Sequence, residues 1–207
     1  MNKIYKIFII FPFLILGCKP NLIEDTKFIQ KINSLDMNIF SNEGEKIYSI
    51  KSPNTSYNKE KNIFNLEKTT IKLFKDEVLE FIIKSNESKL YENNKIVELK
   101  GNVELRSINQ DNDVLYADNF IWNVDETNYL LKGNVIFEND TIILSSSKAT
   151  LNSENIIEFF NPVKYIIKNQ SNEKSYEINS ENAYYNIDKK SVNFSSKDKR
   201  VRSKIYF

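Results

Sequence analysis

The feature that most constrains the fold of this chain is a strand pattern that repeats. The run Lys100-Gly101-Asn102-Val103 recurs 32 residues later as Lys132-Gly133-Asn134-Val135. Around the first copy, in residues 97–106, every odd position is apolar or Gly and every even position is polar or charged. This alternation predicts a β-strand with one buried face. A slip of one residue would expose that whole face, so the register of the strand is well fixed.

The same pattern divides the chain from Met37 onward into about five units, each made of two strands and a polar turn. Aligned in register, the clearest units agree position by position. The equivalent sets are Leu115, Leu144 and Ile178; Phe120, Ala149 and Ala183; Trp122, Leu151 and Tyr185; Leu99, Leu131 and Phe159; Val103, Val135 and Val163; and Leu105, Phe137 and Tyr165. A period of roughly 30 residues is typical of repeat architectures. We therefore predict an all-β domain of stacked two-strand ribs over residues 37–207.

The apolar stripe on these strands has two interpretations. The first is the packed core of an ordinary β protein. The second is that two curved layers leave an apolar trough that accepts lipid chains. The candidate trough residues are Leu99, Val103, Leu105, Phe120, Trp122, Leu131, Val135, Phe137, Leu151, Phe159, Val163 and Tyr165.

One column of the aligned units predicts where the sheet bends. Gly101, Gly133 and Asn161 occupy equivalent positions in the middle of strands. A Gly inside a strand usually marks a bend, a bulge or a close approach. Asn tolerates the same unusual backbone angles better than most residues do. We interpret these three residues as a structural bend.

Composition excludes several kinds of site. The chain has no His, which removes His-ligated metal sites and Ser-His-Asp catalysis, and its single Cys removes internal disulfides and multi-Cys metal sites. With 29 Lys and Arg against 28 Asp and Glu, no nucleic-acid footprint is expected. Asp111 and Asp113 are interpreted as turn residues rather than as a catalytic pair. The sequence predicts no enzyme, no metal and no cofactor.

The N-terminus has the form of an export signal. Lys3 and Lys6 precede an apolar run over residues 7–16, which is shorter than the roughly 20 residues that span a bilayer. The run ends in Leu16-Gly17-Cys18, which resembles a bacterial lipobox. The resemblance implies a signal peptide over residues 1–17 and lipidation of Cys18. The alternative is an uncleaved N-terminal membrane helix. Residues 18–36 are expected to form a tether with residual helix, because Phe28, Ile29 and Ile32 have helical spacing.

The ribs resemble the LptC/LptA/OstA family, the periplasmic bridge proteins of lipopolysaccharide export. The resemblance is carried by residues 98–103, residues 130–135 and Leu115-Tyr116-Ala117-Asp118, within a region of about 37–186. The length and the N-terminal anchor favour the LptC branch. The resemblance implies an open, twisted antiparallel β-jellyroll, often called a β-taco. It also implies that lipid A acyl chains pass along the trough.

The partners implied by the resemblance are lipopolysaccharide, an inner-membrane ABC transporter and an LptA-like periplasmic protein bound by edge-strand pairing. The implied location is the periplasmic face of the inner membrane, with the N-terminus as anchor. The better-known LptC proteins keep an uncleaved helix, so the lipobox is a departure that leaves the anchor type open. The alternative function is a non-conducting lipoprotein that uses the ribs only to bind protein.

Overall fold

The computed structural model describes residues 29–91, 95–108, 112–124, 126, 128–160, 162–168, 174–197 and 200–206. The regular structure in these ranges is β throughout, and none of it is a helix that could cross a membrane. The predicted signal peptide, Cys18 and tether residues 18–28 lie outside the described residues.

The strands are β1 (Ile29–Phe40), β2 (Lys46–Asn58), β3 (Ile63–Lys75), β4 (Val78–Tyr91), β5 (Ile96–Ser107), β6 (Val114–Asn123), β7 (Asn128–Glu138), β8 (Ile142–Leu151), β9 (Ile156–Phe160), β10 (Val163–Lys168), β11 (Lys174–Ser180), β12 (Asn182–Asn186), β13 (Ser191–Ser195) and β14 (Arg202–Ile205). All of their pairings are antiparallel.

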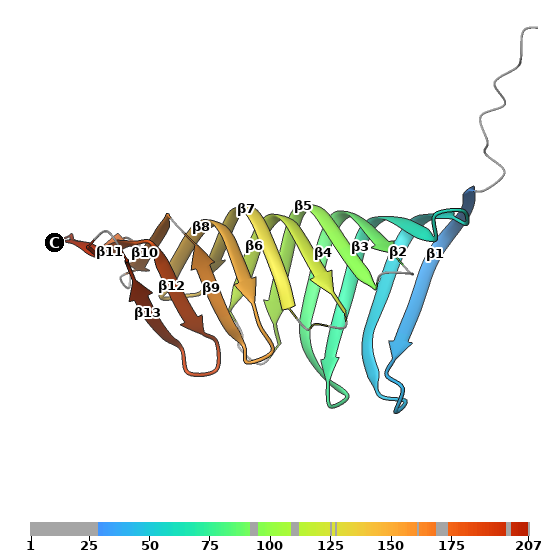
Figure 1. Ribbon diagram of the computed structural model, residues 1–207, viewed down its shortest axis with the longest axis horizontal. Coiled ribbons are helices and arrows are strands. Elements are labelled where there is room, and N and C mark those ends of the chain that lie inside the picture. The colour runs from blue at the N-terminus through green and yellow to red at the C-terminus, as the bar shows by residue number, and fades with distance from the viewer. Residues whose placement is uncertain are drawn as a thin grey trace, which may run out of the picture.

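These strands form one sheet that follows the chain order. From β1 to β8 each strand pairs with the next. Beyond β8 the ladder forks, because residues 142–145 of β8 pair with β10 whereas residues 148–151 pair with β9. The strands β9 and β10 are thus two halves of one interrupted strand, as are β11 and β12. Figure 1 shows β1 at one end of the long axis and the C-terminus at the other.

A bend in the long strands folds this sheet onto itself. Gly101 and Asn102 both have positive φ, at 72° and 49°, and so do Gly133 and Asn134, at 73° and 45°. At these points β5 and β7 each contain one residue more than either neighbouring strand. An extra residue with left-handed backbone is a β-bulge, which bends the strand that carries it. The predicted bend is therefore observed at both glycines, whereas Asn161 lies outside the described residues.

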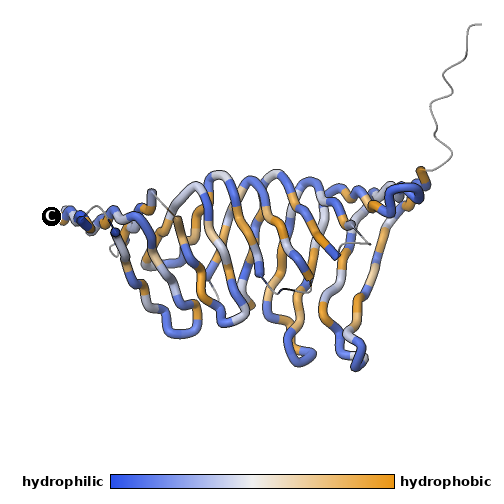
Figure 2. Tube along the Cα trace, viewed as in Figure 1, coloured by the Kyte–Doolittle hydropathy of each residue, from blue (hydrophilic) through white to orange (hydrophobic). Residues whose placement is uncertain are grey.

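The bend divides the sheet into two layers. Layer 1 contains the C-terminal halves of β1, β3, β5 and β7 and the N-terminal halves of β2, β4, β6 and β8, together with β10, β11 and β14. Layer 2 contains the N-terminal halves of β1, β3, β5 and β7 and the C-terminal halves of β2, β4, β6 and β8, together with β9, β12 and β13. Side chains alternate between the two faces of each strand, and Figure 2 shows hydrophobic and hydrophilic residues alternating along the trace.

The inward side chains form continuous rows across the strands. In layer 1, one row of register partners is Ile50, Ile71, Ile83, Leu105, Leu115, Phe137, Leu144, Tyr165 and Ile178. In layer 2, another is Leu99, Phe120, Leu131, Ala149, Phe159, Ala183 and Phe194. These two rows contain four of the six sets that the repeat alignment made equivalent. The expected all-β, open antiparallel jellyroll of stacked ribs is confirmed.

The N-terminal boundary of the domain differs from the prediction. Residues 29–36 were assigned to a tether with a possible helix, but they belong to β1. The spacing of Phe28, Ile29 and Ile32 suggested a helix turn. Residues 29–40 instead form a strand paired with β2, because this pairing gives hydrogen bonds to the backbone N–H and C=O groups on the side of β1 that faces β2.

The bend predicts a measurable asymmetry between two glycines. A Cβ atom on Gly133 would lie 2.5 Å from Oδ2 of Asp118, whereas one on Gly44, at φ 90°, would meet nothing within 4 Å. Gly44→Ala should therefore cost only the left-handed backbone penalty of about 1–2 kcal/mol. Gly133→Ala should cost more, since Asp118 must also move. Urea unfolding measures both, and equal losses would contradict a close approach at the bend.

Candidate functional site

The predicted trough residues all face the space between the two layers. Eleven of the twelve have exposed fractions of 0–3%, and Tyr165 is half-buried. They belong to one hydrophobic cluster that runs along the sheet. In this structure the space between the layers is therefore filled by side chains, as in a packed core.

Aromatic pairs join the layers across this space. The ring centroids of Tyr48 and Trp122 are 4.8 Å apart, and those of Phe137 and Tyr185 are 4.4 Å apart. The first pair joins β2 to β6, and the second joins β7 to β12. The layers are thus displaced along the stack, which is the expected consequence of a strong sheet twist. Burial raises the pKa of Tyr48 to about 12.

Polar contacts also join the layers, at the ends of the strands away from the bend. Asn155, in the turn after β8, donates from Nδ2 to Oε1 of Glu80 on β4 at 3.1 Å. The Tyr185 hydroxyl on β12 lies 3.5 Å from Oδ2 of Asp113, which precedes β6. These contacts hold the rims of layer 1 and layer 2 together, so widening the space between the layers requires breaking them.

Asp113 is the buried charged group of this rim. Its exposed fraction is 6%, and its Oδ1 accepts a hydrogen bond from Nδ2 of Asn139 at 2.9 Å. Burial raises the pKa of Asp113, and the hydrogen bonds from Asn139 and Tyr185 partly oppose that rise. From the sequence Asp113 is interpreted as a turn residue, because nothing local to residues 111–113 indicates contact with residue 185.

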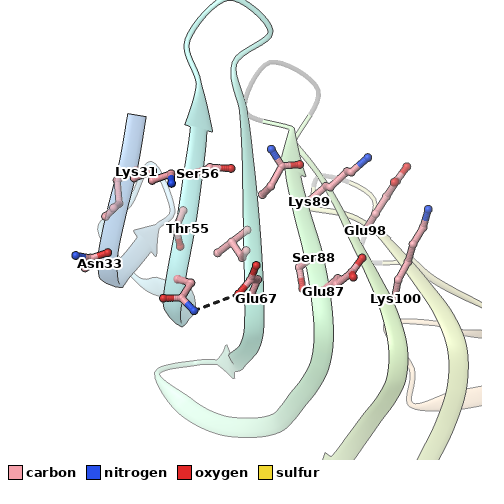
Figure 3. Close-up of a pocket in the computed structure, with 14 residues that line it drawn as sticks. Lys31, Asn33, Thr55, Ser56, Glu67, Glu87, Ser88, Lys89, Glu98 and Lys100 are labelled. Carbon is pink, nitrogen blue, oxygen red and sulfur yellow. Dashed lines mark hydrogen bonds between the residues drawn. The ribbon is translucent and has the colours of Figure 1, made fainter. Parts of the chain in front are cut away.

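A separate hollow of about 600 Å³ lies over the first five strands, lined mostly by residues that alternate with the inward ones, with the buried residues Thr55, Leu66 and Ser88 also in its lining. Figure 3 shows its lining, which includes Lys31, Lys89, Lys100, Glu67, Glu87 and Glu98. Glu98 and Lys100 flank the buried Leu99, so their side chains point away from the core. The hollow is polar and has equal numbers of Lys and Glu residues. It is not the predicted apolar trough.

Each end of the sheet has strands with a free side. Within the described ranges, β1 pairs only with β2, β13 only with β12, and β14 only with β11. Ile29 and Phe40 of β1 are 50% and 56% exposed, and Ile205 of β14 is 61% exposed. A free strand edge presents unpaired N–H and C=O groups that another strand can bind.

Comparisons with known proteins give a family and similar solved structures. The family model described as "Lipopolysaccharide-assembly, LptC-related" matches residues 24–153. One of the similar solved structures is LptH of Pseudomonas aeruginosa, described as the LptA-homologous periplasmic component of the lipopolysaccharide transport device. It is 12% identical, with a TM-score of 0.49, over 61% of this chain and 94% of that chain. No curated protein matches this chain.

The rim carboxylate predicts a pH-dependent contribution to stability. The pKa of Asp113 is higher in the folded than in the unfolded chain, so the folded state retains its proton to higher pH. Its contribution to the free energy of unfolding must then fall as pH rises above about 4, the usual Asp value. The change that Asp113→Asn makes to the free energy of unfolding, measured against the wild type at the same pH, should be more favourable at neutral pH than at acid pH. Urea unfolding at both pH values measures the difference.

Tyr185→Phe tests the same carboxyl group through its hydrogen-bond partner. It removes a hydroxyl whose interaction lowers the pKa of Asp113, so the dependence on pH should become steeper. An Asp113→Asn effect of the same size at both pH values would contradict the burial of a titrating carboxyl group at the rim.

Proposed function

Because this chain belongs to the LptC-related family of lipopolysaccharide assembly, whose model matches more than half of its length, we propose that it conducts lipid A acyl chains between its two layers. The family makes the chain a periplasmic component of lipopolysaccharide transport and not an enzyme. The finer proposal is that the twelve inward residues named above form the conducting surface. Acyl chains would enter when the layers separate.

The observation that carries this proposal is the continuity of the inward rows. In layer 1 the row of apolar residues runs from Ile50 on β2 to Ile178 on β11. In layer 2 the apolar row runs from Leu99 on β5 to Phe194 on β13. A surface of this kind suits a ligand that slides, because successive strands in each row offer similar contacts. Hydrocarbon chains gain about 0.8 kcal/mol per buried CH₂ group, so they could replace side-chain contacts when the rims part.

The free edges support the proposed partners. A strand added to β1 at one end, or to β13 and β14 at the other, would continue the inward rows into a neighbouring protein. We propose that these edges serve an inner-membrane ABC transporter and an LptA-like periplasmic protein. Transfer then needs no chemistry on this chain, since the transporter's ATPase supplies the energy.

The packed interior favours a second candidate function. A non-conducting envelope lipoprotein that binds only protein would have a dry, filled core, and the exposed fractions of 0–3% for residues such as Leu131 and Val135 agree with that. The two functions differ in whether lipid ever contacts the inward side chains.

A photo-crosslinking amino acid at Phe137 separates the two functions. Phe137 is 1% exposed and faces inward, so a conducting trough should give adducts with lipopolysaccharide in cells. The same group at the neighbouring position Ile136, whose side chain points to the opposite face, should give none. Absence of lipid adducts from both positions, in a folded protein, would favour the non-conducting function.

We also propose that the chain is attached to the membrane through Cys18. Metabolic labelling with a fatty acid should label the wild-type protein, and Cys18→Ser should abolish both the label and the removal of residues 1–17. A Cys18→Ser protein that is still processed and labelled would refute lipidation at this residue.

A further inference from the structure

The inner surface changes character between β4 and β5, close to the bend. On β2, β3 and β4 five hydroxyl residues face inward there, with exposed fractions of 1–6%; they are Ser52, Thr55, Thr69, Ser85 and Ser88, here called the hydroxyl strip. On β5, β6 and β7 the same part of the surface is apolar. The row that contains Thr55 and Ser88 continues as Leu99 and Phe120, and Val103 pairs with Ala117.

Three of the five hydroxyl groups have partners. Ser52 donates to the carbonyl oxygen of Glu67 at 2.8 Å and accepts from its N–H at 3.2 Å. Ser85 and Ser88 are bonded to each other, with their hydroxyl oxygens 2.8 Å apart. These contacts satisfy the three Ser hydroxyl groups at the bend, where the regular ladder is interrupted.

The other two hydroxyl groups, on Thr55 and Thr69, are buried without a hydrogen-bond partner. A buried polar group without a partner lowers stability. Val has nearly the same shape and suits a strand at least as well. The chain therefore carries two hydroxyl groups at a cost to its stability, which is expected where a polar group finds its partner only in a bound state.

We propose that the hydroxyl strip is a binding site for a hydroxyl group carried on an acyl chain. The inference rests on the proposed function, since the ligand must enter between the layers. The surrounding side chains, such as Ile71, Ile83 and Leu66, are 0–2% exposed and apolar, so most of the ligand must be hydrocarbon. A hydroxyl group both donates and accepts, as each Thr hydroxyl does, so a ligand hydroxyl can pair with the hydroxyl of Thr55 or with that of Thr69.

Charge on the bound part of the ligand does not fit this site. Among the described residues the buried charged side chains are Asp113 and Glu177, and neither lies on β2, β3 or β4. An anionic group placed at the strip would be buried without a cation, at a large desolvation cost. The strip thus selects the polar substituent of a chain rather than its charged head group, and it does so at the end of the stack next to β1.

The test compares ricinoleic acid with oleic acid, which differ by one hydroxyl group on the same chain. Isothermal titration calorimetry below the micelle concentration should show that the wild-type protein binds ricinoleic acid about fivefold more tightly, the ratio expected for one added hydrogen bond worth about 1 kcal/mol. The double variant Thr55→Val with Thr69→Val should lose that preference. Its urea midpoint should rise, because two unpaired hydroxyl groups are gone.

Thr70→Val is the matched control. Thr70 neighbours Thr69 on β3, but its side chain points to the other face, so both the preference and the urea midpoint should stay close to those of the wild type. Equal binding of the two acids by the wild type, or a preference that survives in the double variant, would overturn the proposed site and leave the acyl-chain trough intact. A fall in the urea midpoint of the double variant would also overturn it, since the hydroxyl groups would then be paired.

Failure of both acids to bind the wild-type protein would instead refute the conducting trough itself, and the strip with it. The comparison of the two acids on the wild type needs no variant, so the proposal remains testable even if the double variant does not fold.

Discussion

The whole architecture depends on a sheet with one apolar face that must be buried against itself. The described residues form one continuous sheet, and no helix among them covers that face. Bending each long strand near its middle brings the two halves of the apolar face together. The left-handed backbone at Gly101 and Gly133 makes the bend, and Asp118 fills the space that a side chain on Gly133 would need. The core, the rims and the free edges all follow from this bend.

Folding the sheet onto itself in this way places opposite requirements on the inward contacts for stability and for transport. Stability requires that inward side chains meet, and contacts such as Phe137 with Tyr185 satisfy that demand. Transport of an acyl chain requires that the same contacts separate. The rim contacts of Asp113 and Asn155 are polar, so hydrogen bonds to water can replace them when the layers part. The buried, unpaired hydroxyl groups of Thr55 and Thr69 likewise reduce the stability of the closed state near β1.

Much of the fold could be predicted because its determinants are local. Alternation in residues 97–106 gives the strand and its buried side, and the repeated Gly-Asn pair gives the bend. The repeat alignment placed Leu105 with Phe137 and Leu99 with Leu131, and the sheet brings both pairs into common rows. The prediction for residues 29–36 was wrong because a weak local helix pattern was read without the strand partner in β2 that overrides it. Membership of the family was also predictable from short return strands, since the motif describes the bend itself.

The sequence by itself determined which side chains face inward on each half-strand, because period two leaves no other choice between one bulge and the next. It did not determine which inward side chains meet. Tyr48 contacts Trp122, and Asp113 lies near Tyr185, only because the twist displaces layer 1 along layer 2. That displacement is the sum of small rotations over many strands, and no short run of residues encodes it. The tertiary structure alone therefore decided that the space between the layers is closed here, and that two threonine hydroxyl groups are buried in it without a partner.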